Sequence, residues 1–438
     1  MKSMAIESQN SLVSDTDLHS LGVRLKPEIE RVAAAWGSGY NSEYAFLSLP
    51  GDKALVRSVQ AVIDEKQKFE PTMLIVIGIG GSNLGTVAVH EALQGLFYNS
   101  FNPLKIYFAD TVDSDYIGRI VALMEKELHD GNNVIVTIIS KSGTTTETVA
   151  NAQILIQILQ KHKGRDYSDY MVTITDEGSL LWELAQQHRW ARLAIPKKVG
   201  GRYSLFSAVG LFPLGMLGID ITMLLKGAES IKHVSCSLDI AHNIPAMSAA
   251  ILCAQHRKGI TIHDTFVFAV CLKSIGAWYR QLMAESIGKA ESKTGSIINE
   301  GITPIVSVGS TDLHSMAQLY LGGPYDKFTT FLSVAKRSND LKLPKESPLT
   351  GIVDNIQGVS CNHIMDAMLR GIQAAYKKNK RPFIGIQLPE LNAYYIGQLL
   401  QAKMVEMVYL GFLLNVNPFD QPQVELYKKE TREILAHE

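Results

Sequence analysis

The chain has 438 residues, which is enough for two or three domains and a large core. Its 42 lysines and arginines face 43 aspartates and glutamates, so no overall basic field is available to hold a nucleic acid or an anionic membrane surface. The longest uninterrupted apolar run, residues 266–272, is far shorter than the roughly 20 residues that a membrane-spanning helix needs. We therefore expect no nucleic-acid and no membrane partner.

The N-terminal segment mixes polar and apolar side chains and contains no apolar stretch of the signal-peptide type, so we expect the chain to stay in the cytoplasm. Its four cysteines form no CxxC pair, as expected in a reducing compartment. Its twelve histidines form neither an HExxH motif nor a close cluster with carboxylates. We therefore expect no disulfide framework, no resident metal ion and no cofactor.

Along the chain, the first sixty residues have helical spacing and reach a turn at Pro50, Gly51 and Asp52. From Met73 onward, short apolar runs alternate with longer amphipathic stretches, which is typical of buried parallel strands and the helices that cover them. The expected strands of this first unit are 73–78, 105–109, 134–139, 171–175 and 192–195.

After an apolar connector over 209–225, the same alternation returns, with expected strands at 265–270, 304–309, 328–334 and 383–388. From residue 398 the chain is expected to be helical, with a break at Asn417 and Pro418 and a second helix over about 422–436. The fold class is thus α/β, with two tandem parallel-sheet sandwich domains. The expected division is a helical segment 1–60, a first domain 61–205, a helical connector 206–250, a second domain 251–400 and a helical tail 401–438.

In parallel sheets, ligands bind beyond the carboxyl ends of the strands, where loops lead into helix N-termini. The glycine loop, residues 78–83 with the sequence GIGGSN, follows the first expected strand. Its glycines, such as Gly81, let backbone amides approach a ligand, and Ser82 adds a hydroxyl at the expected N-cap. A tight turn with a cap would explain the same residues. A nucleotide is disfavoured, because Asn83 replaces the last glycine of GxGxxG and Thr86 stands where a P-loop has lysine.

A hydroxyl-rich loop, residues 140–148 with the sequence SKSGTTTET, follows the third expected strand and opens a helix over 145–162. Six hydroxyl side chains and Lys141 at a helix N-terminus supply many donors and one positive charge, as a phosphate monoester dianion requires. Capping needs only one hydroxyl, from Thr145 or Thr146, so it does not account for the whole loop. Together with Ser82, this loop predicts a phosphorylated small molecule as the ligand.

Four further segments contain candidate catalytic side chains. Arg202 follows paired glycines in GGRYS, and Gln281 and Glu285 stand four residues apart in a helical run, so they share one face. Glu285 is a candidate general base because its neighbours are largely apolar. His314 lies in GSTDLHS after an expected strand, and Lys428 lies in FDQPQVELYK after a proline suited to a helix start. The alternatives are a structural ion pair, a surface Gln/Glu pair, a structural histidine and a solvated lysine.

In this order, the segments GIGGS, SKSGTTTET, GGRYS, QLMAES, GSTDLHS and FDQPQVELYK resemble the glucose-6-phosphate isomerase family. The resemblance covers almost the whole chain except the first sixty residues, and the length is similar to that of the shorter bacterial members. It implies two sugar-isomerase (SIS) domains and a helical tail. It also implies reversible isomerisation of glucose 6-phosphate and fructose 6-phosphate, in glycolysis and gluconeogenesis, by a homodimer with shared active sites.

The resemblance also implies a role for each candidate side chain. Glu285 matches the base that moves a proton between C2 and C1, and Arg202 matches the cation that stabilises the enediolate. His314 and Lys428 match the pair that opens the sugar ring. The substrate and its phosphate are expected to contact Gly81, Ser82, Ser140, Lys141, Ser142, Thr145, Gln281 and Gln421.

Three other functions remain as alternatives. A bifunctional phosphoglucose/phosphomannose isomerase would share the fold and the base, and activity on mannose 6-phosphate would identify it. A catalytically silent sugar-phosphate sensor needs the phosphate loops, but it does not need Glu285, Arg202, His314 and Lys428 together. A dinucleotide oxidoreductase, with Asp110 as a ribose ligand, is disfavoured because the glycine fingerprint is absent.

Overall fold

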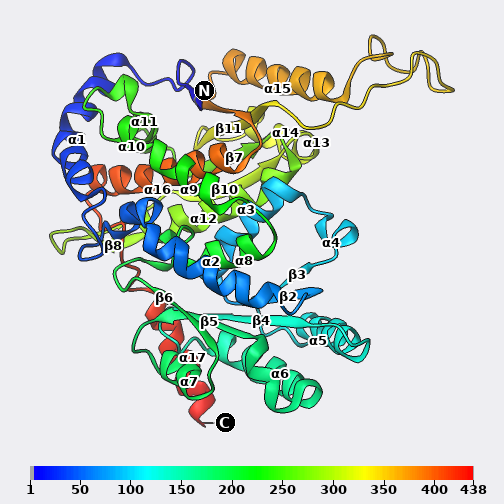
Figure 1. Cartoon of the computed structure of the whole chain (residues 1–438). Helices are drawn as coiled ribbons and strands as arrows, with labels where there is room; N and C mark the ends of the chain where they lie inside the picture. The colour runs from blue at the N-terminus through cyan, green and yellow to red at the C-terminus, as the bar shows by residue number, and fades with distance from the viewer. Residues whose placement is uncertain (1–3, 438) are drawn as a thin grey trace.

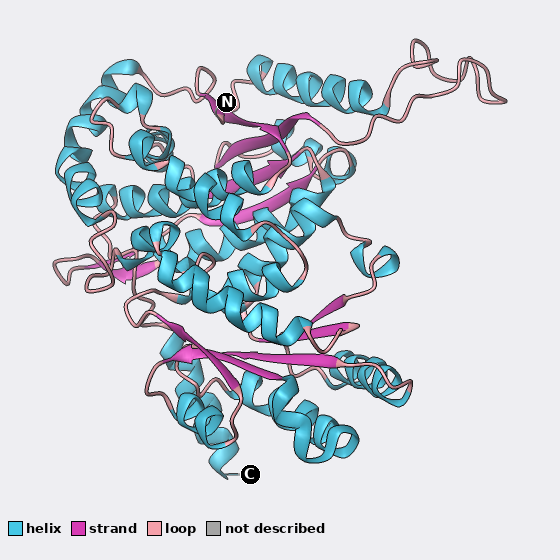
Figure 2. Ribbon diagram, in the orientation of Figure 1, coloured by secondary structure: helices cyan, strands magenta, loops and turns pink. Residues whose placement is uncertain are grey.

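The computed structural model describes residues 4–437 and contains two five-stranded sheets, which lie toward opposite ends of the molecule (Figures 1 and 2). Helices cover both sheets, and α3 (Leu84–Gln94) and α12 (Lys273–Ile287) contact each other between them. The predicted α/β architecture with two parallel-sheet units and helical ends is thus confirmed. Among the described residues, no helix is long and apolar enough to cross a membrane.

The first sheet is entirely parallel, in the order β3-β2-β4-β5-β6. Its central strands are buried along their whole length, which explains why they are continuous apolar runs in the sequence. Because neighbouring parallel strands end at the same edge, the loops that follow β2 and β4 emerge side by side. The strands are β2 (Met73–Ile77), β3 (Lys105–Ala109), β4 (Val134–Ile139), β5 (Met171–Asp176) and β6 (Ala191–Ile195).

The second sheet has the order β1-β12-β11-β7-β10, in which only the edge strand β1 is antiparallel. A separate two-stranded ribbon pairs β8 with β9. The strands are β1 (Ala5–Glu7), β7 (Ile262–Val267), β8 (Lys289–Glu291), β9 (Ile297–Glu300), β10 (Thr303–Val308), β11 (Lys327–Lys336) and β12 (Phe383–Glu390).

The helices range from single turns, such as α4 (Tyr98–Phe101), to long helices, such as α1 (Asp15–Ala35). Short 3₁₀ turns at Gly80–Ser82 and Gly201–Tyr203 carry two of the predicted site segments. The remaining helices are α2 (Lys53–Gln67), α5 (Ser114–His129), α6 (Thr146–Lys163), α7 (Leu180–Gln187), α8 (Ala208–Met216), α9 (Ile221–Ser230), α10 (Lys232–Ser235), α11 (Ile244–Arg257), α13 (Thr311–Ser315), α14 (Ala317–Gly322), α15 (Cys361–Lys378), α16 (Ala393–Leu413) and α17 (Val424–His437).

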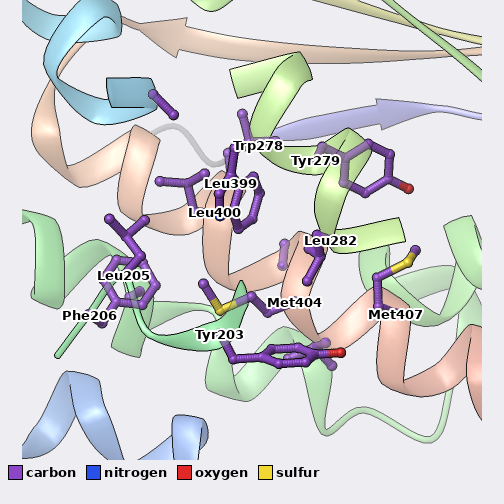
Figure 3. Packing of buried hydrophobic residues seen from close by; sticks show 14 of the residues in the cluster. Tyr203, Leu205, Phe206, Trp278, Tyr279, Leu282, Leu399, Leu400, Met404 and Met407 are labelled. Carbon is purple, nitrogen blue, oxygen red and sulfur yellow. The ribbon is translucent and has the colours of Figure 1, made fainter. Parts of the chain in front are cut away.

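The deepest part of the core surrounds α16, which is apolar around most of its circumference and is buried along almost all of its length. It packs against α9, α11 and α12. Figure 3 shows this packing, with Trp278 and Leu282 of α12 near Leu399 and Met404 of α16. One face of α12 is therefore fixed in the core, and this helix also carries Gln281 and Glu285.

Four strands differ from the sequence prediction by more than one or two residues at an end. β7 begins earlier than the expected apolar run, because its polar residues His263 and Asp264 are fully buried in the sheet. β1 and the ribbon β8-β9 were not predicted. β1 is very short, and it pairs with β12 near the other end of the chain, with Ala5 opposite Gln387. Three residues are too few to show a periodic pattern, so the local sequence does not predict this strand.

Candidate functional site

Three predicted segments meet at the carboxyl edge of the first sheet. The glycine loop contacts the turn that carries Arg202 so closely that a Cβ on Gly81 would lie 2.7 Å from the backbone nitrogen of Arg202. The hydroxyl of Ser204 donates to the carbonyl of Gly81 at 3.3 Å. Gly80 has φ +58°, and a Cβ there would lie 2.8 Å from the amide nitrogen of Gln281. Gly81 is therefore required for the two backbones to approach each other, and Gly80 is required for the left-handed backbone conformation at its position.

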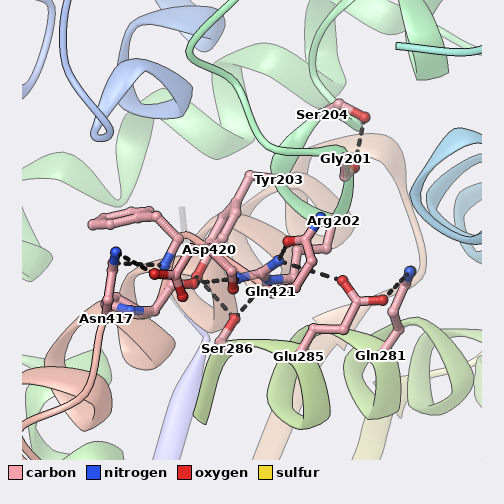
Figure 4. Close-up of polar contacts among 12 residues, drawn as sticks. Gly201, Arg202, Tyr203, Ser204, Gln281, Glu285, Ser286, Asn417, Asp420 and Gln421 are labelled. Carbon is pink, nitrogen blue, oxygen red and sulfur yellow. Dashed lines mark hydrogen bonds and ion pairs between the residues drawn. The ribbon is translucent and has the colours of Figure 1, made fainter. Parts of the chain in front are cut away.

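Arg202 and Glu285 form the centre of the cluster (Figure 4). Arg202 Nη1 donates to Glu285 Oε2 at 3.3 Å, and Gln281 Nε2 donates to Glu285 Oε1 at 2.9 Å, so both carboxylate oxygens have a donor. The side chain of Arg202 is 1% exposed, whereas that of Glu285 is 28% exposed. The predicted sharing of one face by Gln281 and Glu285 is thus confirmed, and the carboxylate keeps access to solvent while the guanidinium is fixed behind it.

The guanidinium of Arg202 is held by the tail segment, residues 417–421. Nη2 donates to the carbonyl of Pro418 and, at 3.0 Å, to that of Asp420, while Nη1 also donates to Gln421 Oε1. Nε donates to the hydroxyl of Ser286 at 2.9 Å. These contacts bring Gln421 to the cluster from the distant C-terminal part of the chain (Figure 4).

The hydroxyl-rich loop lies beside the glycine loop, because the two follow neighbouring strands: a Cβ on Gly78 would touch both Ser82 and the end of β4. Within the loop, the hydroxyls of Ser140 and Thr145 pair at 2.9 Å. Thr145 is the N-cap of α6 but makes no capping hydrogen bond with its side chain, so this hydroxyl is directed into the loop. Burial lowers the pKa of Lys141, an effect that Asp176 opposes and Lys198 adds to.

The expected N-cap role of Ser82 is wrong. Ser82 lies within the 3₁₀ turn, and the N-cap of α3 is Asn83. The amide of Asn83 donates to the carboxylate of Asp110 at 2.8 Å. Asp110, the candidate ribose ligand of the oxidoreductase alternative, is therefore engaged in a contact within the protein.

Lys428 faces the hydroxyl-rich loop across a cavity of about 600 Å³, whose wall includes Thr144, Thr145 and Tyr427. Its ammonium donates to Glu425 at 2.8 Å on the same helix. No residue of α17 is buried among the side chains that the structure describes. The helix thus covers the loop without packing into the core.

His314 lies on α13 and is exposed. Within residues 4–437 its ring makes no hydrogen bond or ion pair, and nothing joins it to the Arg202–Glu285 cluster. Of the four candidate catalytic side chains, the described chain thus joins Arg202 and Glu285 directly, places Lys428 beside the hydroxyl-rich loop, and leaves His314 apart from both.

The sequence did not indicate the residues behind the cluster. Tyr203 OH donates to the carbonyl of Pro418 at 3.2 Å and lies 3.1 Å from the hydroxyl of Ser286. Lys289, buried at the start of β8, pairs with Asp420. Ser286 and Lys289 follow Glu285 closely in the sequence. The contacts of Ser286 are with Arg202 and Tyr203, and those of Lys289 are largely with backbone carbonyls, and neither kind of contact has a signature in a sequence.

No group of three or more histidine, cysteine or acidic side chains in the described part of the chain has the geometry to hold a metal ion. The positive charge at the centre of the cluster comes from Arg202.

Comparison with known proteins gives a consistent result. The family model for phosphoglucose isomerase matches residues 66–438. The chain is 32% identical over 404 residues to a glucose-6-phosphate isomerase of Carboxydothermus hydrogenoformans, covering 90% of this chain and 86% of that protein. It is 32% identical over 435 residues to one of Fusobacterium nucleatum, covering 97% and 94%. A crystal structure of a glucose-6-phosphate isomerase from Chlamydia trachomatis superposes with a TM-score of 0.84 at 23% identity, covering 100% of this chain and 89% of that one.

Proposed function

Because the chain belongs to the phosphoglucose isomerase family, it is an aldose-ketose isomerase that interconverts glucose 6-phosphate and fructose 6-phosphate, and we propose that the Arg202–Glu285 cluster performs the chemistry. The observation that supports this proposal is the partly exposed carboxylate of Glu285, held between the amide of Gln281 and the buried guanidinium of Arg202. A carboxylate so placed can accept a proton from a substrate carbon without losing its orientation.

The proton transfer needs a base and a positive charge. Glu285 removes the proton from C2 of the open-chain aldose and returns it to C1, while an enediolate forms between these steps. Arg202 stabilises the negative oxygen of that enediolate, and because its side chain is already fixed by the tail segment, little reorganisation is required when the charge develops.

The hydroxyl-rich loop binds the substrate phosphate in this proposal. The hydroxyls of Ser140, Ser142 and Thr145, the charge of Lys141 and the N-terminus of α6 converge on one loop, which suits a dianion. Ser82 and the backbone at Gly81 border the same edge of the sheet. Binding at the phosphate orients the sugar toward Glu285.

Ring opening is assigned to Lys428 and His314. Lys428 lines the same cavity as Thr144 and Thr145, so a sugar whose phosphate lies on the loop is within the region that α17 covers. His314 is exposed and makes no polar contact with the cluster in the described chain, which supports a role in the active site of a second subunit.

We further propose that the enzyme is a homodimer and acts in the cytoplasm. The segment 337–360, which joins β11 to α15, projects from the body of the molecule (Figure 1). It exposes the apolar side chains of Leu341, Leu349 and Ile352, with exposed fractions of 73%, 69% and 73%. Such side chains on a projecting segment suit burial against a second copy of the chain.

The test of the base is Glu285→Gln, which keeps size and hydrogen bonding but removes the proton acceptor. We expect near-complete loss of isomerisation in a coupled fructose 6-phosphate assay and of solvent-proton exchange at C2, with substrate binding largely retained. Glu30→Gln, on the exposed side of α1, is the matched control. Normal C2 exchange in Glu285→Gln would identify another residue as the base.

The shared site is tested by mixing Glu285→Gln with His314→Ala after denaturation and refolding together. If His314 acts across the dimer, a mixed dimer has one intact site and one doubly altered site. Random reassortment makes half of the dimers mixed, so activity returns to roughly a quarter of the wild-type value. A mixture that has exchanged subunits and remains inactive contradicts the shared site but not the isomerase activity.

A further inference from the structure

Lys289 is a buried cation that the proposed chemistry does not use. Its side chain is 4% exposed, although an ammonium group loses several kcal/mol of hydration free energy on burial. Nζ donates to the carbonyl of Glu285 at 2.8 Å and to the carbonyl of Asp420, and it lies 3.0 Å from Asp420 Oδ1. These three acceptors match the three donors of a lysine ammonium.

Asp420 connects this lysine to Arg202. Its carbonyl accepts from both Lys289 Nζ and Arg202 Nη2, the latter at 3.0 Å. Its carboxylate accepts from the amide of Asn417 at 2.9 Å through Oδ2 (Figure 4), whereas Oδ1 is the oxygen that lies near Lys289. The next residue, Gln421, accepts from Arg202 Nη1. One residue of the tail segment is thus bonded to both cations.

We propose that Lys289 and Asp420 form a positioning pair, which holds the tail segment against the last turn of α12 and thereby fixes Arg202 relative to Glu285. Lys289 contacts the backbone of Glu285 itself, so the pair links the base directly to the acceptors that orient the guanidinium. This inference rests on the proposed roles of Glu285 and Arg202, and it adds two residues that do not touch the substrate.

The electrostatics agree with this arrangement. Burial lowers the pKa of Lys289, and the hydrogen bond to Asp420 opposes that effect. The nearby Arg202 also lowers the pKa of Lys289, whereas the charges of Asp420 and Glu285 raise it. Positive and negative groups therefore alternate from Asp420 through Lys289 and Glu285 to Arg202, and removal of either member of the pair leaves the other without its counter-charge.

The experiment compares Lys289→Met, Asp420→Ala and the double variant with the wild-type enzyme. We expect each single variant to lower kcat by at least tenfold and by up to about 100-fold, which is the loss that a displacement of about 1 Å can cause. KM for fructose 6-phosphate should change by less than about threefold, because the hydroxyl-rich loop, which is proposed to bind the phosphate, lies between β4 and α6 and not on α12 or the tail segment. The double variant should be no slower than the slower single variant, since the two residues act as one unit.

Lys105→Met is the matched control, because Lys105 of β3 forms an ion pair of the same length, 3.0 Å, with Glu127 of α5, away from the Arg202–Glu285 cluster. We expect its kcat to equal that of the wild type. Because Asp420 is half exposed, Asp420→Ala creates little cavity and decides the question if Lys289→Met fails to fold. Urea unfolding and circular dichroism measure the folded fraction of each variant.

Three results would overturn the proposal. The first is an unchanged kcat per folded molecule with lowered stability, which would make the pair a structural cross-link only. The second is a rise in KM at constant kcat, which would place the effect on binding. The third is a double variant whose loss is the product of the single losses, because the residues would then act independently. An inactive wild-type enzyme would instead refute the proposed function, so the two failures are distinguishable.

Discussion

The contact between the glycine loop and the Arg202 turn predicts a severe and asymmetric effect of adding a single methyl group. In Gly81→Ala, the new Cβ would lie 2.7 Å from the backbone nitrogen of Arg202 and closer still to the carbonyl group of Gly201. Ordinary contact begins near 3.4 Å, so the turn has to move by about 1 Å. Both close neighbours are backbone groups, which cannot rotate away as a side chain can.

A displacement of about 1 Å at Arg202 should lower kcat roughly 100-fold, and the overpacking should cost about 1–3 kcal/mol of the free energy of unfolding. The matched variant is Gly201→Ala, on the opposite side of the same contact. Its Cβ would meet only the Cα of Gly81, at 3.9 Å, so we expect kcat to stay within about threefold of the wild type. The coupled fructose 6-phosphate assay measures kcat, and urea unfolding corrects it for the folded fraction. Equal losses in the two variants, or normal activity in Gly81→Ala, would refute the steric reasoning.

Three further outcomes are expected. Thr145→Ala should raise KM by about 10- to 100-fold, as for a lost hydrogen bond to a charged group, and leave kcat nearly unchanged; a fall in kcat alone would contradict a role in phosphate binding. Burial raises the pKa of Asp264 from 3.8 to about 7, so between these pH values the folded chain keeps a proton that the unfolded chain has lost. As pH rises from about 4 to 7, this residue therefore lowers the free energy of unfolding by up to about 4 kcal/mol. Asp264→Asn should remove that fall in urea unfolding curves, and an unchanged pH dependence would show that Asp264 is ionised in the fold. Activity should survive exhaustive chelation because Arg202 supplies the charge at the enediolate, whereas loss in EDTA with recovery in a divalent ion would contradict this.

The sequence predicts the first sheet well because the burial of each of its strands is visible in that strand's own residues. A strand such as Val134–Ile139 is buried on both faces, so it has to be a continuous apolar run, and the run is visible without any knowledge of the fold. β7 shows where this reasoning fails. His263 and Asp264 are as deeply buried as the apolar residues that follow, but a pattern of hydrophobicity counts them as loop. Burial lowers the pKa of His263 to about 3, so a polar side chain can fill a core position in its neutral form.

The candidate site likewise contains features that the local sequence indicates and contacts between distant segments that it does not. Spacing within a few residues indicates three features of the site: the glycine loop, the hydroxyl-rich loop, and the pair Gln281 and Glu285. They lie together because the first sheet ends both loops at one edge and α12 places the pair beside that edge. The roles of those side chains stay predictions until the variants are measured. The orientation of Arg202 could not be predicted, since Nη2 donates to the carbonyls of Pro418 and Asp420, which are far away in the sequence, and every residue has a carbonyl.

The base and the cation of the proposed site are held in place by different kinds of contact. Glu285 projects from a helix whose other face contributes Trp278 and Leu282 to the deepest core, so the position of the base is maintained by the packing that also maintains the fold. Arg202 is held instead by a short run of hydrogen bonds to the tail segment, which includes Gln421. Lys428 lies on α17, none of whose described side chains is buried. Substitutions in the core should therefore reduce stability and activity together. Substitutions of Asp420 and Gln421, the exposed polar residues of the tail segment, should reduce kcat with little effect on the free energy of unfolding, because the apolar contacts of that segment come from Pro418 and Phe419 instead.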